Sequence, residues 1–281
     1  MFLGYNTNGF AHHRLEDAIE ILAEQGYRGV ALTVDYQHLN ILESGWNEYA
    51  QTIKQLLDRH QMQLVIETGA RFLLDPRRKH QPTLLDSAPS QRQIRQEFLQ
   101  RCVQLAQILG AECISFWSGA LPKDTHPDLA WERLTNEIHT LLQISEQTRV
   151  RLAFEPEPGM LISRMADFEV LHDLINHELF GLTLDCSHLT CEGDLPASDH
   201  IRKWLQHKKL WNIHLADMNA GIHDHLMFGE GAVDFADIFH ALQEGNYSEG
   251  AFVELSRHSH QAVQIASDSM AFLRTFVSAT A

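Results

Sequence analysis

The amino-acid sequence predicts an α/β protein that folds as one (β/α)₈ TIM barrel, a single domain spanning residues 1–281. Eight short β-rich runs alternate with longer stretches whose apolar residues recur at helical spacing, and this alternation is typical of a parallel sheet. The length of 281 residues suits such a barrel, which takes about 250. No linker or composition shift divides the chain. An open, doubly wound sheet is the structural alternative, but no GxGxxG motif follows the first strand to indicate dinucleotide binding.

The first four strand–helix units occupy the N-terminal half of the chain. We expect strands at residues 2–7, 29–35, 64–69 and 113–119, and helices at residues 15–25, 46–60, 94–109 and 129–145. The first helix places Ala18, Ile19 and Leu22 on one face and stops at Gly26. A long polar and basic loop, residues 70–89, separates the third strand from its helix.

The last four units follow the same pattern. We expect strands at residues 150–156, 180–185, 210–217 and 251–256, and helices at residues 166–176, 201–206, 235–244 and 261–276. Gly245 follows the helix at 235–244 as a stop signal. Eight such units predict the closed barrel.

The composition limits the partners and the location that we expect. Lysine plus arginine number 22 and aspartate plus glutamate 37, a formal net charge of −15, and an acidic chain repels the phosphates of nucleic acid. No apolar run approaches the roughly 18 residues of a membrane span, and the N-terminus lacks the pattern of a secretion signal. We therefore expect a cytoplasmic protein with no nucleic-acid or membrane partner. Four cysteines without a CxxC pair indicate core thiols, with a zinc site at Cys186 and Cys191 as the alternative.

Ionisable residues gather at the carboxyl ends of the last four strands, where TIM barrels hold their active sites. Glu155, Asp185, His214 and Glu254 each occupy one of these strands. Their neighbours along the chain are nearly all apolar, so the alternation of side chains in a strand points all four into the barrel. Buried charges without partners cost several kcal/mol, and a shared divalent metal ion would compensate them. For any single residue, a helix cap or a structural ion pair is the alternative.

Five more polar residues lie near the same rim. The side chain of Glu157 is expected to point to the same side of the strand as that of Glu155. It is a candidate for substrate contact, or else a solvated loop acid. His188 is a candidate for contact with substrate oxygens, or else a polar loop histidine. Asp217 either orients a ligand or caps the next turn. His223 and His225 precede a GEG sequence, and one of them could bind substrate or a second metal ion.

The third and fourth strands contribute further candidates for substrate binding. Glu67 ends the third strand, and Arg71 follows it in the basic loop that also contains residues 77–80, RRKH. Arg71 could hold a phosphate or carboxylate group of the substrate, while a solvated charge run on a mobile loop is the alternative. Trp117, at the end of the fourth strand, either forms an apolar wall for the substrate or packs under this loop.

These motifs resemble the xylose isomerase-like TIM barrel superfamily, which includes AP endonuclease family 2 members. The stretches that carry the resemblance are LAFEPEPG (152–159), LTLDCSH (182–188), WNIHLADM (211–218), HDHLMFGEGAVDF (223–235) and AFVELS (251–256). With the strand spacing, they cover essentially the whole chain, which is similar to sugar and sugar-phosphate isomerases and ketose 3-epimerases. The resemblance implies that Glu155, Asp185, His214 and Glu254 bind the metal. It also implies that Glu155 and Glu254 are the acid/base pair and that His188 touches the substrate.

The chemistry of this ligand set fits proton transfer beside a carbonyl group. A divalent metal ion stabilises the developing enediolate, while one carboxylate removes a proton and a second returns one. Three carboxylates and one imidazole favour Mn²⁺ or Mg²⁺, with Co²⁺ or Zn²⁺ as alternatives. We expect an isomerase or epimerase that acts on a small sugar, sugar phosphate or hydroxy-keto acid. A homodimer is compatible with this type of barrel.

Three other functions stay open. An AP endonuclease-like phosphodiesterase would use further metal-binding histidines on strands three and four, but these strands end in Glu67-Thr68 and Trp117-Ser118. A metal-dependent dehydratase begins with the same proton abstraction, so the sequence does not separate it from an epimerase. A non-catalytic metabolite-binding barrel would not need two opposed carboxylates.

Overall fold

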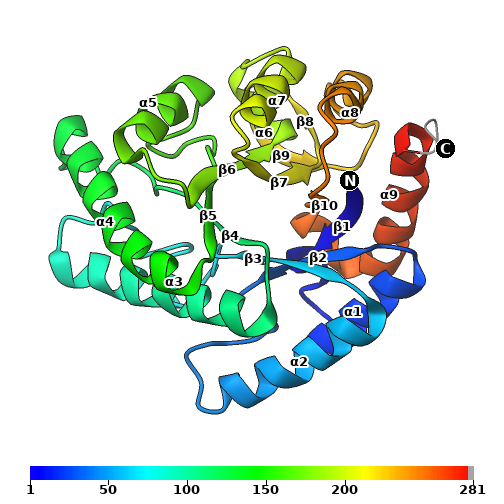
Figure 1. The fold of residues 1–281 in the computed structure, drawn as a ribbon, viewed down its shortest axis with the longest axis horizontal. Helices are drawn as coiled ribbons and strands as arrows, with labels where there is room; N and C mark the ends of the chain where they lie inside the picture. The colour runs from blue at the N-terminus through cyan, green and yellow to red at the C-terminus, as the bar shows by residue number, and fades with distance from the viewer. Residues whose placement is uncertain (278–281) are drawn as a thin grey trace.

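The computed structural model describes residues 1–277 as a closed barrel of eight parallel strands with helices around it (Figure 1). Around the barrel the strands follow the order β1-β10-β7-β6-β5-β4-β3-β2. They are β1 (Phe2–Asn6), β2 (Gly29–Thr33), β3 (Gln63–Glu67), β4 (Cys113–Phe116), β5 (Arg151–Phe154), β6 (Phe180–Asp185), β7 (Leu210–Leu215) and β10 (Gly250–Val253). The predicted (β/α)₈ barrel is confirmed, and the open-sheet alternative is excluded.

The predicted helices are all present outside the strands. They are α1 (Leu15–Glu24), α2 (Trp46–His60), α3 (Pro89–Leu109), α4 (Pro127–Thr148), α5 (Met165–Ile175), α7 (Ala197–Gln206), α8 (Phe235–Glu244) and α9 (Ala262–Val277). Four of them, α3, α4, α5 and α7, begin earlier than predicted. Two of these begin at Pro89 and Pro127, because the fixed φ of proline suits the first helical turn. Within residues 1–277, no helix has the length and apolar character needed to cross a membrane.

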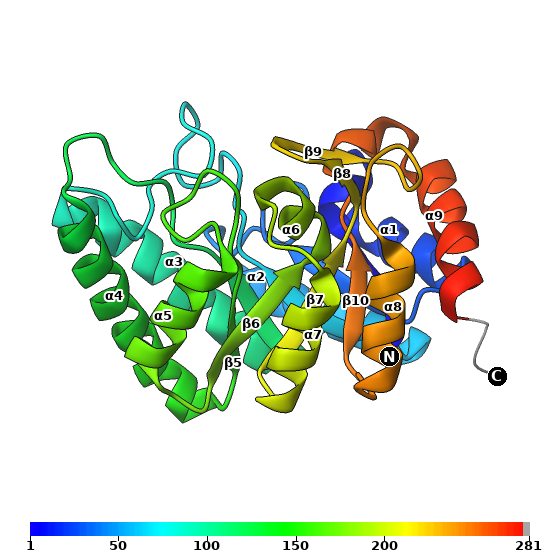
Figure 2. The ribbon, with the colours of Figure 1, turned by 90° about the horizontal axis from the view of Figure 1, so that it is seen from above.

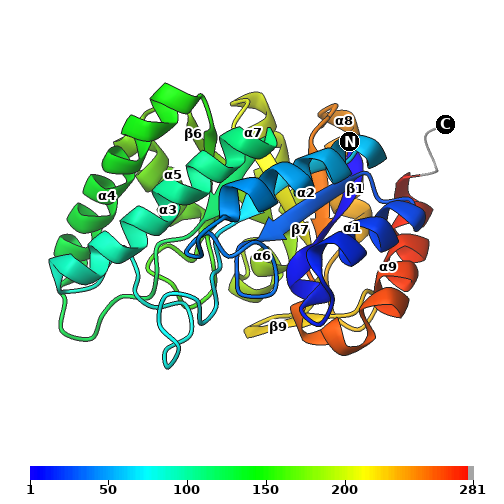
Figure 3. The same cartoon turned by 90° about the horizontal axis from the view of Figure 1, so that it is seen from below.

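The sequence pattern misses several elements at the rim. Helix α6 (Cys186–Glu192) follows β6 directly, and β8 (Asp217–Asn219) pairs with β9 (Ile222–Leu226) as an antiparallel hairpin. The predicted strand at 210–217 is therefore wrong at its end, because the chain leaves the barrel after β7 and turns into β8. The 3₁₀ helices η1 (Thr7–Phe10) and η2 (Ser256–Gln261) are also new. The hairpin lies at the same end of the barrel as the loop between β3 and α3 (Figures 2 and 3).

A small apolar cluster fills the barrel below this rim. Its buried members are Ala31, Val65, Cys113, Ala153, Trp211 and Phe252. Trp211 and His214 are three residues apart, yet both face the interior, because the pairing of β6 with β7 shifts register between Leu182 and Thr183. Gly181 leaves room for the indole, since a Cβ at Gly181 would lie 2.7 Å from the Trp211 ring. The other buried apolar side chains form a larger cluster.

An acid pair at the amino ends of the strands predicts how stability changes with pH. Arg151 lies between Glu112 and Glu249: its Nε donates to the Glu112 carbonyl at 2.9 Å, and its Nη1 lies 3.4 Å from Glu249 Oε1. Burial, reinforced by the Glu249 carboxylate, raises the pKa of Glu112 from 4.5 to about 7. The contribution of this group to stability is thus fully present below about pH 4.5 and is lost as the pH rises through about 7.

We therefore expect Glu112→Gln to flatten the decline in melting temperature between about pH 5 and about pH 8, because glutamine does not ionise. Thermal unfolding followed by circular dichroism at several pH values measures this. A variant whose melting temperature declines as steeply as that of the unaltered protein would contradict the assignment.

Candidate metal centre and active-site cavity

The four residues expected to bind a metal ion converge at the carboxyl ends of four strands. Glu155 follows β5, Asp185 ends β6, His214 lies on β7 and Glu254 follows β10, and one ligand atom of each lies within 4.8 Å of the others. Glu155, Asp185 and His214 are buried. Phe154, which precedes Glu155, packs outward against Phe168 of α5, as strand alternation requires.

His214 lies at the centre of this group because both of its ring nitrogens face carboxylates. Nδ1 lies 3.1 Å from Glu155 Oε1 and 3.0 Å from Glu254 Oε2, and Nε2 lies 2.9 Å from Glu67 Oε1. Burial alone would lower the pKa of His214, but the three carboxylates outweigh burial and raise it well above its usual value. A proton on Nε2 that is donated to Glu67 leaves the Nδ1 lone pair for a metal ion. Such carboxylate–histidine hydrogen bonds commonly orient metal-binding imidazoles.

Asp185 brings one oxygen that accepts no hydrogen bond to the same point. Its Oδ1 accepts hydrogen bonds from Ser187 N (2.7 Å), Ser187 Oγ (2.6 Å) and His188 N (3.2 Å), which caps α6. Its buried Oδ2 accepts none from any of the residues that the structure describes, although His188 Nε2 lies 3.4 Å and His225 Nε2 3.8 Å from it. A buried acceptor without a partner is costly, and a divalent cation would satisfy it. The donor set of three carboxylates and one imidazole therefore fits a hard divalent metal ion.

Glu155 and Glu254 lie on the same side of the His214 ring but in different surroundings. Asn8 Nδ2 donates to Glu254 Oε1 at 2.8 Å. Burial opposes ionisation of Glu254, but His214 outweighs burial and lowers the pKa of this carboxyl. Burial raises the pKa of Glu155 well above its usual range, against the effect of His214. Two carboxyl groups whose environments differ in this way can take different roles in proton transfer.

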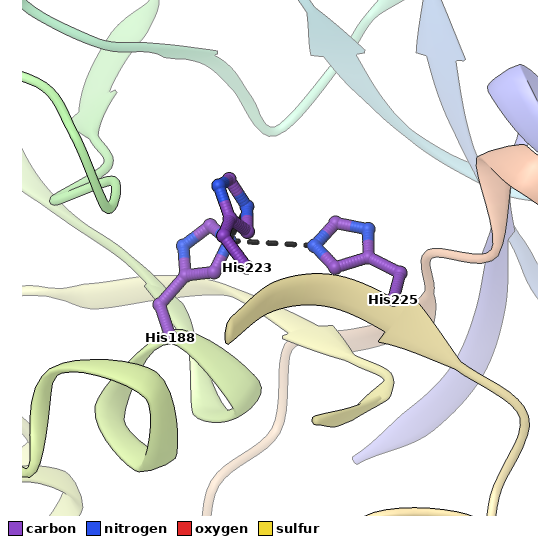
Figure 4. Close-up of side chains that lie close together, drawn as sticks. All are labelled: His188, His223 and His225. Carbon is purple, nitrogen blue, oxygen red and sulfur yellow. Dashed lines mark hydrogen bonds between the residues drawn. The ribbon is translucent and has the colours of Figure 1, made fainter. Parts of the chain in front are cut away.

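Three histidines form a second group beside the first (Figure 4). His188 projects from α6, and His223 and His225 project from β9. The Nε2 atom of His188 lies 3.1 Å from that of His223 and 3.4 Å from that of His225. A proton on His188 Nδ1 can be donated to the Pro156 carbonyl at 3.3 Å, which leaves the Nε2 lone pair inside the cluster. Converging imidazoles of this kind could hold a cation or contact substrate oxygens.

A polar cavity of about 230 Å³ opens above both groups. The predicted site residues that line it are Glu67, Arg71, Trp117, Glu155, Glu157, His188, His223, His225 and Glu254. Trp117 lines the cavity, and its ring also packs against the His80 ring of the loop at 5.4 Å, while its contact with substrate stays a prediction. The zinc alternative at Cys186 and Cys191 gains no support, since all four cysteines are free and neither belongs to a ligand group among residues 1–277.

Asp217 differs from the other predicted site residues. Its Oδ1 accepts hydrogen bonds from Met218 N (2.9 Å) and Val233 N (3.1 Å), and its Oδ2 accepts one from Gly229 N (2.8 Å). Both oxygens are thus used to fix the segment after β9. The structure favours the turn-capping alternative for Asp217 over the orientation of a ligand.

Several cavity residues do not follow from our reading of the sequence. They are Asn6, Asn8, Thr33, Ser115, Ser256 and Arg257. Asn6 and Thr33 end β1 and β2, so the strand alternation that we applied to the last four strands could have found them. Arg257 lies beyond β10 in η2, where no strand pattern places a side chain.

Comparison with known proteins gives a family match and distant curated relatives. The model of the family described as xylose isomerase-like TIM barrel matches residues 19–276. An inosose dehydratase of Clostridium botulinum (strain Eklund 17B / Type B) is 24% identical over 141 residues, which cover 44% of this chain and 46% of the relative. The chain thus spans about half the length of the curated relatives that it matches.

Solved structures share the fold over nearly the whole chain. The 3-keto-D-glucoside 4-epimerase from E. coli superposes with a TM-score of 0.80 at 17% identity, covering 98% of this chain and 99% of that one. A D-allulose 3-epimerase from Methylomonas sp. in complex with D-allulose has a TM-score of 0.77 at 15% identity, with 98% and 96% covered. The IolI protein with a bound zinc atom has a TM-score of 0.74 at 17% identity, with 99% and 98% covered. Because the family model spans most of its length, the chain belongs to the xylose isomerase-like TIM barrel family.

Proposed function

We propose that the protein is a divalent-metal-dependent isomerase or epimerase of a small, sugar-like hydroxy-carbonyl compound. The observation that carries this proposal is the position of Glu155 and Glu254, which both lie beside Nδ1 of His214 and line a small polar cavity. Two carboxyl groups beside a bound substrate can remove a proton and return one. Family membership and the sugar epimerases among the structural relatives support the substrate class.

The floor of the cavity suits the removal and return of a proton. A metal ion held by Glu155, Asp185, His214 and Glu254 would stabilise negative charge on the carbonyl oxygen. Glu254, whose Oε1 is fixed by a hydrogen bond from Asn8, exchanges a proton with the carbon beside the carbonyl. Glu155 exchanges the second proton with the substrate. Return to the opposite face of the same carbon gives an epimer, and return to the neighbouring carbon gives an isomer.

Mn²⁺ or Mg²⁺ is the metal that we favour, because three of the four ligands are carboxylates. Zn²⁺ is the first alternative, since the IolI protein holds zinc in a barrel of the same fold. Co²⁺ suits the same ligands.

A metal-dependent dehydratase is the second candidate function. The curated relatives named as inosose dehydratases favour it. Dehydration begins with the same proton abstraction, but a hydroxide then leaves from the adjacent carbon and needs a proton from a general acid. The product, with one water fewer, separates this outcome from an epimer.

Metal depletion and reloading test the proposal. We expect the chelated protein to be inactive and Mn²⁺ to restore the interconversion of ketose epimers or of a ketose and an aldose, followed by chromatography. Loss of water from a polyol ketone would favour the dehydratase. Cleavage of an abasic DNA duplex without sugar turnover, or turnover that does not depend on metal, would overturn the proposal.

The hydrogen bond between Glu67 and His214 predicts that Glu67 supports metal binding by orienting the imidazole. We expect Glu67→Gln to weaken metal affinity by about 10- to 100-fold, because the imidazole loses the carboxylate that fixes its orientation. Competition titration against a chelator measures this. Glu157→Gln is the control, since Glu157 lines the same cavity but makes no hydrogen bond to the four ligands. Equal metal affinities of the Glu67 variant and the control would refute a positioning role for Glu67.

A further inference from the structure

We propose that the substrate carries a phosphate group at the end remote from its reacting carbons, and that Arg71, Lys79 and Arg257 bind this group at the cavity mouth. This inference rests on the function proposed above and names the chemical class of its substrate. All three cations line the same cavity as Glu155 and Glu254. They come from two distant parts of the sequence, the loop between β3 and α3 and the segment after β10.

Arg71 is linked to the proposed acid/base pair by one residue. Its Nη2 donates to the Asn8 carbonyl at 3.0 Å, and the Asn8 side chain donates to Glu254 at 2.8 Å. Its Nη1 lies 4.0 Å from Asp35 Oδ2, which is too far for a hydrogen bond. The Asn8 carbonyl thus holds Nη2, while Nε and Nη1 donate no hydrogen bond to the residues that the structure describes. A planar fork of donors suits the oxygens of a phosphate.

Lys79 has no hydrogen bond or ion pair with other residues in the part of the chain that the structure describes, yet it lines the cavity. Arg257 Nη1 lies 2.6 Å from Asp224 Oδ1, and its side chain is 63% exposed, so further donors can reach a ligand.

The cavity therefore has an acidic floor and a basic mouth. Glu67, Glu155 and Glu254 line the floor, and the three cations line the entrance. In a chain with a formal net charge of −15, an anion would be repelled from most of the surface. The cations at the mouth attract phosphate, so binding of the phosphate there directs the hydroxy-carbonyl end of the substrate towards the metal ligands.

The neighbouring cations of the same loop do not share this position. Arg77 and Arg78 are exposed, as Lys79 is, but they do not line the cavity, and Arg78 Nε donates to Asp75 Oδ2 at 2.7 Å. Only some of the basic side chains of the loop thus line the cavity. A phosphate monoester, with about 1.5 to 2 negative charges near neutral pH, would engage all three cations, whereas an uncharged ketose such as D-allulose would engage none of them by charge.

Inorganic phosphate is the first probe, because its binding does not depend on turnover. Isothermal calorimetry is expected to show phosphate binding to the metal-loaded protein, weakened about tenfold in Lys79→Gln through the loss of one charge-assisted hydrogen bond. Arg77→Gln, which removes an equal charge from the same loop outside the cavity, should leave the affinity unchanged. No phosphate binding, or equal weakening in both variants, would overturn the inference.

Kinetics then separate the anion site from the proposed reaction. We expect kcat/KM to be higher for a ketose phosphate than for the free ketose, and Lys79→Gln to raise KM for the phosphate about tenfold with little change for the free ketose. Equal kcat/KM values for the two would overturn the phosphate site while the proposed function stands. Preference for a sugar carboxylate over the phosphate would also overturn it. Phosphate binding that depends on Lys79, without turnover of any sugar, would support the site and count against the proposed function.

Discussion

The Glu254→Gln variant is expected to lose turnover by about 10³-fold or more, since the removal of a positioned acid or base costs about 10² to 10⁴ and a metal ligand is weakened as well. Glutamine keeps the shape of the side chain, and its amide oxygen can still accept the hydrogen bond from Asn8. It cannot exchange a proton with the substrate. The rate should be measured at saturating metal, so that weaker metal binding does not account for the loss.

The matched control for this experiment is Glu230→Gln, an exposed residue in the segment after β9. This variant should keep full activity and the melting temperature of the unaltered protein. Full activity in Glu254→Gln, with the metal bound, would remove Glu254 from the acid/base pair.

The Asp185→Asn variant should bind metal more weakly than a variant of a residue that only contacts a metal ligand, as Glu67 does. Asp185 Oδ2, which accepts no hydrogen bond, is the oxygen that we assign to the metal. Asparagine replaces this charged ligand by a neutral one. We expect metal affinity to fall by more than about 10- to 100-fold, the range that is typical when a residue in contact with a metal ligand is replaced. The rise in melting temperature on adding Mn²⁺, which follows binding to the folded state, should disappear.

Asp234→Asn controls for the second role of Asp185, which is to cap a helix. Asp185 caps α6 and Asp234 caps α8 through a side-chain oxygen, and asparagine retains such an oxygen at both positions. The Asp234 variant should still be stabilised by Mn²⁺. An Asp185 variant that is stabilised to the same degree would show that this carboxylate does not bind the metal.

The barrel and the convergence of the four candidate metal ligands could be predicted because they depend on local rules. Alternation along short strands fixes the inward facing of Glu155, Asp185 and Glu254 once the strands are located. The inward orientation of His214 does not follow from alternation alone, since the register shift between β6 and β7 is what lets both Trp211 and His214 face inward. No sequence periodicity signals such a shift.

The remaining parts of the site depend on loops and on contacts between distant residues. Helix α6 is only seven residues long, too short for a helical pattern to be recognised, and the β8–β9 hairpin brings His223 and His225 onto His188. Glu67 was expected to contact substrate, while its hydrogen bond to His214 joins residues that are 147 positions apart. Such a pairing follows from barrel closure and not from any local motif.

Deuterium exchange followed by NMR is the most direct test of metal-assisted proton transfer in this cavity. The metal-loaded protein would be incubated in D₂O with ketoses, ketose phosphates and hydroxy-keto acids. Incorporation of deuterium at a carbon beside a carbonyl, abolished by chelation and by Glu254→Gln, is the predicted result. Protein that binds metal and ligand but exchanges no carbon-bound proton with solvent in any of these compounds would contradict it and would favour a binding barrel.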